Sequence, residues 1–173
     1  MEPPVYDVSD YLPDKVDAAS GRSSIKVAHD LWRHLRTDSS VLLPPEKTVR
    51  DFCWFDSAVQ NGFTVLLGRC SGPEIFARGL NAARAIKAFE HTRIMEEAKA
   101  VMEHHGLIFP DPLPEPWWDP MDGVSWEMEQ AIATDLDDLD TRYDRVYEIA
   151  GDVYMKLLQY VYDHRDALAC RRP

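Results

Sequence analysis

The sequence lacks the features of a membrane-spanning or exported chain. Its 173 residues contain no apolar run of about 18 residues, the length that a transmembrane helix needs. The opening "MEPPVYDVSD" has neither the basic nor the apolar segment of a signal peptide. The three cysteines, Cys53, Cys70 and Cys170, are too few and too widely spaced for a disulfide framework. We therefore expect a cytoplasmic protein with reduced thiols, and we expect Cys53 and Cys70 to be buried among their apolar neighbours.

The residue patterns of common enzymes are also missing. "GRCSG" at 68–72 has neither the Lys-Ser/Thr ending of a phosphate loop nor the form of a hydrolase elbow. His29 and His34 are five residues apart and His104 and His105 are adjacent, and neither spacing suits two metal ligands on one helix. We expect the histidines at the surface or at helix ends. The sequence predicts no catalytic residue, no metal site and no cofactor.

Basic residues are scarce in the C-terminal third. Residues 111–166 hold 15 acidic and four basic side chains, and this segment accounts for almost all of the net charge of −11. Nucleic acids and anionic membranes carry the same sign of charge, so neither is expected as a direct partner. The charge instead favours a basic protein.

Apolar residues recur at helical spacing, which predicts an all-α fold. The predicted helices cover about 24–36, 45–61, one or two segments of 73–105, and the chain from 126 onward, which Gly151 can divide. The stretch 63–70 is short and apolar and is expected to be helical or irregular. The length predicts a single compact domain over 21–170, with an irregular arm at 1–20 and a Pro-rich connection near 110–120 that Trp117 and Trp118 anchor.

Core candidates follow from the same spacing. In the first three predicted helical regions they are Ile25, Ala28, Leu31, Trp32 and Leu35; Val49, Phe52, Cys53, Asp56 and Val59; and Ile75, Phe76, Leu80, Ala83, Ile86, Phe89, Ile94, Ala98, Val101 and Met102. In the last region they are Leu136, Leu139, Tyr143, Val146, Ala150, Val153 and Leu157. Glu46 is expected at a helix N-terminus, and Gly62 is expected to end a helix with a backbone angle that suits glycine.

The segment "TDLDDLDTRYDRVYEIAGD" at 134–152 combines this last apolar stripe with a row of acids. On a helix of about 100° per residue, Asp137, Asp140, Asp144, Glu148 and Asp152 fall opposite the stripe. Acids four residues apart repel by roughly 0.2–0.5 kcal/mol per pair. The row is either an ordinary solvated face or a surface for a basic partner. Under the second interpretation, Glu127, Glu129, Asp135 and Asp138 would supply a second row.

The middle of the chain resembles a bacterial domain family that includes a small acidic mimic of double-stranded DNA. The resemblance rests on "WFDSAVQNGFTVLLGRCSG", on the following "GLNAARAIKAFEHTRIMEEA" and on the acidic "LDDLDTRYDRVYE", and it covers about 46–168. The chain has Gln60-Asn61-Gly62-Phe63 where the family has Asn-Gly-Gly-Phe, while Phe63 and Gly72 match. Val65 and Arg69 replace two polar positions of the family.

The resemblance implies a mostly helical fold, a homodimer, and an acidic surface that occupies the DNA-binding face of another protein such as a transcription regulator. Two alternatives remain open. One is an immunity protein that neutralises a basic toxin. The other is a small-ligand binder or enzyme with a pocket near the turn Gln60–Gly72.

Overall fold

The computed structural model describes residues 11, 13–17, 22–35, 42–68, 72–109, 121, 123–150 and 153–169. For residues 34–35, 147–150 and 168–169 the description covers the helical backbone alone. The Pro-rich connection at 110–120, with Trp117 and Trp118, lies outside these ranges. So do Cys70, Cys170 and Asp152.

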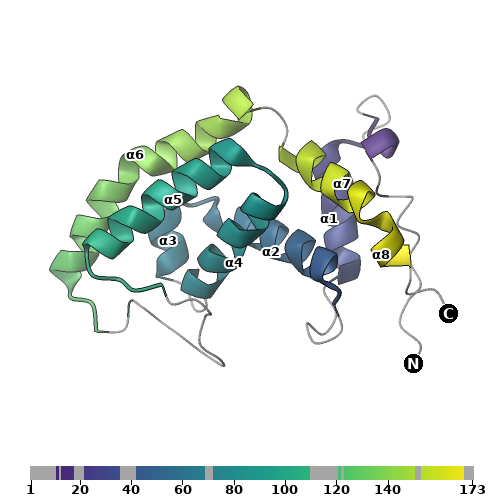
Figure 1. Ribbon diagram of the computed structural model, residues 1–173. Helices are drawn as coiled ribbons and strands as arrows, with labels where there is room; N and C mark the ends of the chain where they lie inside the picture. The colour runs from purple at the N-terminus through teal and green to yellow at the C-terminus, as the bar shows by residue number, and fades with distance from the viewer. Residues whose placement is uncertain are drawn as a thin grey trace.

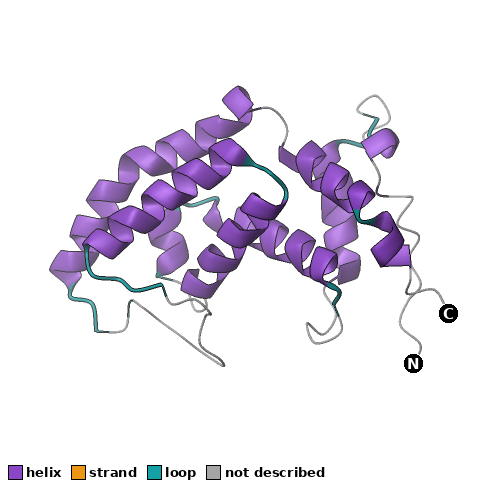
Figure 2. Cartoon of the chain, viewed as in Figure 1, coloured by secondary structure: helices purple, strands orange, loops and turns teal. Residues whose placement is uncertain are grey.

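The regular elements of the described residues are all helices, joined by turns and loops, with a single isolated bridge between Asp17 and Arg22 and no strand (Figure 2). This confirms the predicted all-α fold. The elements are the 3-10 helix η2 (Pro13–Lys15) and the α-helices α1 (Ser24–Leu35), α2 (Pro44–Val59), α3 (Phe63–Leu67), α4 (Gly72–Ala85), α5 (Phe89–His104), α6 (Trp126–Ala150), α7 (Val153–Asp163) and α8 (Arg165–Ala169).

Helix α2 runs through the middle of the molecule and packs against helices on both sides (Figure 1). At one end it meets α4, and beyond α4 the long helices α5 and α6 lie side by side in opposite directions. At the other end α2 meets α1 and α7. The rings of Phe55, Phe63, Phe76 and Tyr143 cluster between α2, α3, α4 and α6, with centroids 5.4–6.5 Å apart. These aromatic contacts fix where α6 lies against the rest of the fold.

The local signals in the sequence are confirmed where they can be compared. The Glu46 carboxylate accepts a hydrogen bond of 2.7 Å from the backbone N–H of Leu43, which satisfies a donor at the start of α2. The ambiguous stretch 63–70 contains the short helix α3, and 73–105 contains the two helices α4 and α5. The last helical region is divided, because α6 ends at Ala150 and α7 begins at Val153.

Two core predictions are wrong. The side chain of Ile25 is 46% exposed and that of Phe89 is 70% exposed. Each directly follows a buried residue, Ser24 or Ala88, so the start of its helix is covered by neighbouring elements. On a helix of about 100° per residue, Ile25 lies at the edge of the buried face of α1, and Phe89 lies opposite the buried His91 and Ile94 of α5. Val101 is half-buried, and the other predicted core positions with described side chains are buried, apart from the half-buried Trp32.

The described part of the N-terminal arm belongs to the helical domain. Tyr11 is buried in the hydrophobic core, and η2 packs against α7. The described part of the predicted irregular arm thus holds only a short 3-10 helix, and a single buried aromatic ring fixes this segment, whose prolines exclude a regular α-helix.

Candidate protein-interaction surface

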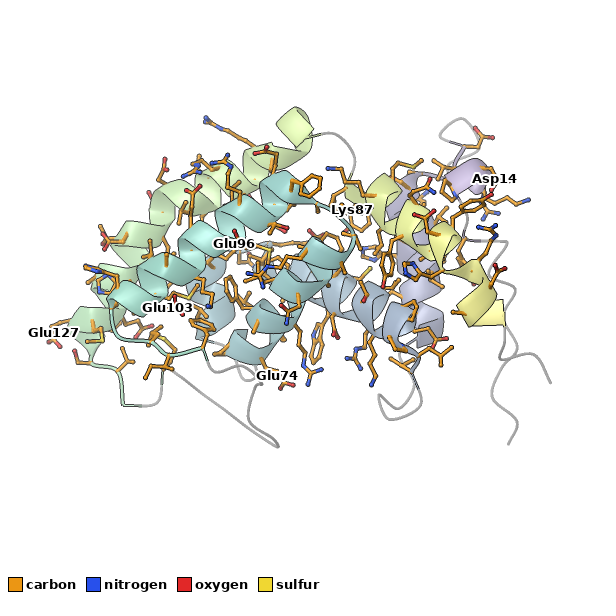
Figure 3. The ribbon with its side chains drawn as sticks, in the orientation of Figure 1. Asp14, Glu74, Lys87, Glu96, Glu103 and Glu127 are labelled. Carbon is orange, nitrogen blue, oxygen red and sulfur yellow. The ribbon has the colours of Figure 1, made fainter. Side chains whose placement is uncertain are left out.

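Helix α6 carries most of the predicted site residues, and its start is fixed by local polar groups. The Ser125 hydroxyl accepts a hydrogen bond of 3.3 Å from the Met128 backbone N–H, as an N-cap serine does. Glu127 and Glu129 occupy the first turn, where a negative charge is favourable beside the helix dipole. Hydrogen bonds from the Glu127 backbone N–H and from Ser125 lower the pKa of the Glu127 carboxyl. Figure 3 shows Glu127 at the outer end of α6, pointing away from the neighbouring helices.

The apolar stripe of α6 faces the core as predicted. Leu136, Leu139, Tyr143 and Val146 are buried, together with Ile132 one turn earlier. Val153 and Leu157 are buried too, but on the separate helix α7. The stripe therefore continues across the break between the two helices.

One side of α6 lies against α5, and we call the acids and base along it (Asp135, Asp138 and Arg142) the α5 flank. Arg142 Nη1 lies 2.7 Å from Glu97 Oε2 of α5 and 3.6 Å from Asp138 Oδ2. The Asp135 carboxylate lies 2.8 Å from His105 Nε2. The hydrogen bond with Arg142 lowers the pKa of Glu97. Acidic charge on this flank is therefore matched by basic groups.

The other side of α6 lies beside α3, and we call its acids (Glu129, Asp137, Asp140 and Asp144) the α3 flank. Seven residues, about two turns, separate Asp137 from Asp144, and eleven residues, about three turns, separate Glu129 from Asp140. The four acids thus lie along the same side of the helix. None of them forms an ion pair with another residue in the described part of the chain.

The prediction that Asp140 lies opposite the core is wrong. The Asp140 carboxylate accepts a hydrogen bond of 2.7 Å from the backbone N–H of Phe63, the first residue of α3. Burial raises the pKa of Asp140, this hydrogen bond opposes the change, and the charges of Asp144 and Asp137 reinforce it. On a helix of about 100° per residue, Asp140 lies only ~80° from the centre of the buried stripe, so a neighbouring element can reach it.

Three acids of the predicted second row are divided between the two flanks, and the fourth, Glu127, lies exposed in the first turn of α6 on neither flank. Glu129 belongs to the α3 flank, while Asp135 and Asp138 belong to the α5 flank beside His105 and Arg142. The side chain of Glu148 lies outside the described residues, as does the whole of Asp152. Among the described side chains of α6, the acids without an ion-pair partner are therefore Glu127 at its start and the single row along the α3 flank.

The turn Gln60–Gly72 approaches the α3 flank directly. Gly62 has φ +94° and ψ 162°, a conformation that is essentially restricted to glycine, and it is the N-cap of α3. This confirms the predicted special backbone angle, but Gly62 does not occupy the left-handed C-cap conformation of α2. A Cβ at Gly62 would lie 2.5 Å from Asp140 Oδ2. Phe63 is fully buried, and Gln60 and Asn61 are exposed.

Gly72 is also required by close approach. A Cβ at this position would lie 1.9 Å from the carbonyl oxygen of Leu66, in the last turn of α3. Gly62 and Gly72 therefore bracket α3, one at the start of that helix and one beyond its end. Together with the buried ring of Phe63 they hold α3 against α6 and α4.

The family described as DMP19-like protein matches residues 41–164. The chain belongs to this family. The match begins and ends a few residues earlier than the 46–168 expected from the sequence, and it contains α2 to α7, whereas α1 lies before it and α8 after it. No curated protein and no solved structure matches the chain significantly. The shared region therefore includes both flanks of α6 and the turn with its two glycines.

A cavity of about 260 Å³ lies beside the turn and is lined in part by Gln60. Its position agrees with the alternative prediction of a pocket near the turn Gln60–Gly72. Asp56 and Gln60 of α2 and its C-cap, Asp144 of α6 and Tyr154 of α7 line it. Asp56 is only 6% exposed, and its carboxylate accepts a hydrogen bond from the Tyr154 hydroxyl. The sequence placed Asp56 on the buried face of its helix, but gave no sign that Tyr154, 98 residues away, would meet it.

One buried polar residue of the DMP19-like chain was not expected. His91 is fully buried in α5, with its ring edge-on to Tyr143 at 5.4 Å. Burial, assisted by the charge of Lys156, lowers the pKa of His91 to about 4 although Glu90 opposes the shift. The expectation that the histidines lie at the surface or at helix ends is wrong here. His91 falls at helical spacing before Ile94 and Met95, and this spacing was the available signal.

Three further observations concern the described residues. Cys53 is buried as expected, and burial raises the pKa of its thiol. In the described parts of the chain, no three His, Cys, Asp or Glu side chains converge as metal ligands. No helix in those parts is both long and apolar enough to cross a bilayer.

Proposed function

We propose that this protein binds a basic protein through the α3 flank and thereby occupies a surface that otherwise binds DNA. The observation that carries the proposal is that the acids on one flank of α6 have basic neighbours and, within the described part of the chain, those on the other do not. The acids of the α5 flank have basic neighbours, whereas Glu129, Asp137 and Asp144 have no ion-pair partner among the described residues. A helix optimised for stability alone would gain from basic residues at those positions.

Family membership supports the same proposal, because DMP19 is a family of DNA mimics. The chemistry of such a partner follows from the charge. A surface that binds DNA presents Lys and Arg to phosphates, and carboxylates on a helix can take the place of those phosphates. A DNA-binding regulator is one protein that presents such a surface.

The charge density of one flank limits the likeness to DNA. From Glu129 to Asp144 the helix rises about 22 Å and carries four acids, whereas one DNA strand carries a phosphate every ~3.4 Å of axis. A second row is not formed on α6, because Asp135 and Asp138 lie beside basic groups. A second copy of the chain would double the row, and a homodimer is part of the proposal for this reason.

The decisive experiment compares two triple variants of equal net charge. Glu129→Gln/Asp137→Asn/Asp144→Asn neutralises the α3 flank and spares Asp140, which caps α3. Glu90→Gln/Glu96→Gln/Glu103→Gln removes three acids of α5 that are paired with Arg93, Arg84 and Lys99. The partner is first isolated from a bacterial extract on the immobilised wild-type protein, eluted with duplex DNA, and identified by mass spectrometry.

Dissociation constants are then measured for all three proteins at several salt concentrations. We expect the α3-flank variant to bind at least about tenfold more weakly and with a smaller salt dependence. The α5 variant should bind much as the wild type does. If both variants lose affinity equally, net charge alone governs binding. If neither does, the α3 flank is a solvated face and the proposal fails.

A further inference from the structure

The cavity beside the turn lies where the two ends of the molecule meet. The central helix α2 supplies Asp56 and Val59, α6 supplies Tyr143 and Asp144, and α7 supplies Tyr154. Ile25 closes one side from α1, which precedes the family-matched region. In Figure 1, α2 runs from the α5–α6 side of the molecule to the α1–α7 side.

The walls of this cavity have a consistent chemistry. Two carboxylates, those of Asp56 and Asp144, line the cavity. No Lys, Arg or His is among its described lining residues. Two tyrosine rings, Tyr143 and Tyr154, and two aliphatic side chains complete most of the wall. Carboxylates between low-dielectric walls concentrate negative potential. Aromatic faces attract cations as well, and aliphatic walls accommodate methylene groups.

The size of the cavity limits the ligand. Its volume of about 260 Å³ exceeds the ~150 Å³ of an engineered cavity that admits benzene. It falls below the ~300–1,000 Å³ of pockets that hold drug-sized ligands. One long side chain or a comparable small molecule fits, whereas a nucleotide or a peptide segment does not.

The position of the cavity indicates where such a group comes from. Asp144 belongs both to the cavity wall and to the α3 flank, so a protein lying along that flank passes over the opening. Gln60 and Ile25 are exposed at the same place, and Ile25 is 46% exposed although it is a large apolar residue. A basic side chain of the bound protein can therefore enter between them.

We propose that this cavity binds the guanidinium group and aliphatic stem of an arginine side chain presented by the basic partner. The proposal rests on the proposed function for the source of the arginine. A guanidinium is preferred to an ammonium because it is more weakly hydrated and stacks on aromatic rings. The Asp144 carboxylate and the buried Asp56 receive its charge, and Ile25 and Val59 contact its methylene groups.

The first test uses N-acetyl-arginine-N-methylamide as the probe and follows methyl and backbone resonances of the intact protein by NMR. We expect saturable shifts at Ile25 and Val59, weaker binding of the corresponding lysine derivative, and no binding of the neutral norleucine derivative. Ile25→Trp fills the opening from an exposed position, and Asp144→Asn removes one charge. Each substitution should weaken binding of the probe by about tenfold. Glu103→Gln, which removes one acid of α5 outside both the cavity and the α3 flank, should leave binding of the probe unchanged.

Several results would overturn the arginine site. These are the absence of saturable shifts, equal binding of the norleucine derivative, or undiminished binding to Ile25→Trp. Because this titration needs no partner protein, its failure is separate from failure of the proposed function, which the two triple variants measure.

A second measurement identifies the source of the guanidinium. If a partner side chain supplies it, Ile25→Trp weakens the partner complex and the probe competes with the partner. If agmatine binds at least about tenfold more tightly than the blocked arginine and Ile25→Trp leaves the partner complex unchanged, the site serves a free small cation. That result would overturn the partner side chain as its ligand.

Discussion

The two sides of α6 differ in whether their acidic residues have basic neighbours. On the α5 flank, Arg142 lies between Glu97 and Asp138, and His105 meets Asp135. On the α3 flank, Asp137 and Asp144 have no basic neighbour within ion-pair distance among the described residues, and both raise the pKa of Asp140. Glu96 and Glu103 of α5, labelled in Figure 3, pair with Arg84 and Lys99.

This difference shows that the described acidic residues of the C-terminal third are paired with basic residues on one side of α6 and left unpaired on the other. Where two long helices pack together, acids and bases from both alternate. Where α6 borders a short helix and a turn, the acids remain together, and one of them is used structurally to cap that short helix. Each of the following predictions changes one side of this comparison.

The largest effect is expected where the α3 flank touches the turn. Gly62→Val forces a β-branched residue to adopt φ +94° and places its Cβ 2.5 Å from Asp140 Oδ2. Backbone strain and loss of the Phe63–Asp140 hydrogen bond together should lower the free energy of unfolding by about 3 kcal/mol. Urea denaturation measures this change.

A matched glycine separates the two causes. Gly106 has φ +87°, but a Cβ there would meet no atom within 4 Å. Gly106→Val should therefore cost only the backbone strain, about 1–2 kcal/mol. Equal losses for the two variants would show that contact with Asp140 contributes nothing at Gly62.

A smaller effect is expected from Asp140 itself. Asp140→Ala removes the acceptor for the Phe63 N–H and should destabilise the protein by about 1 kcal/mol. Asp140→Asn keeps an acceptor and should cost less, while Asp137→Ala should cost almost nothing. If all three variants unfold at the same urea concentration as the wild type, the carboxylate does not cap α3.

The pH dependence sharpens the same comparison. Because the folded protein raises the pKa of Asp140 above 3.8, it binds the proton more tightly than the unfolded chain does. This contribution to stability is present below pH 3.8 and is lost as the pH rises through the folded pKa. The stability of Asp140→Asn relative to wild type should therefore increase from acidic toward neutral pH.

The smallest effect is expected on the α5 flank. Arg142→Met leaves Glu97 and Asp138 without their shared cation and should lower stability by about 0.5 kcal/mol at low salt, since the pair is partly exposed. The loss should disappear in about 1 M salt. Arg145→Met is the control, because Arg145 is exposed and forms no ion pair with another described residue. A salt-independent loss at Arg142 would indicate a packing effect.

Much of the fold could be predicted from the sequence, and the failures concern single positions on helices that were located correctly. Apolar spacing located α1, α2, α5 and α6, and the Pro-Pro-Glu start of α2 was read correctly because a helix N-terminus is determined by adjacent residues. Ile25 and Phe89 failed because one lies at the edge of the buried face of its helix and the other lies opposite that face. His91 failed because residue type outweighed spacing in the prediction.

The sequence by itself determined the helical class, the acidity of the C-terminal third, the need for glycine at position 62 and membership of the DMP19-like family. Each depends on composition or on residues close together in the chain. Only the tertiary structure decided that Asp140 caps α3 across 77 residues, that the remaining acids are divided between two flanks, and that Asp56 and Asp144 share a cavity. These arrangements depend on how helices pack, and helical periodicity specifies which face is buried but not which neighbour will cover it.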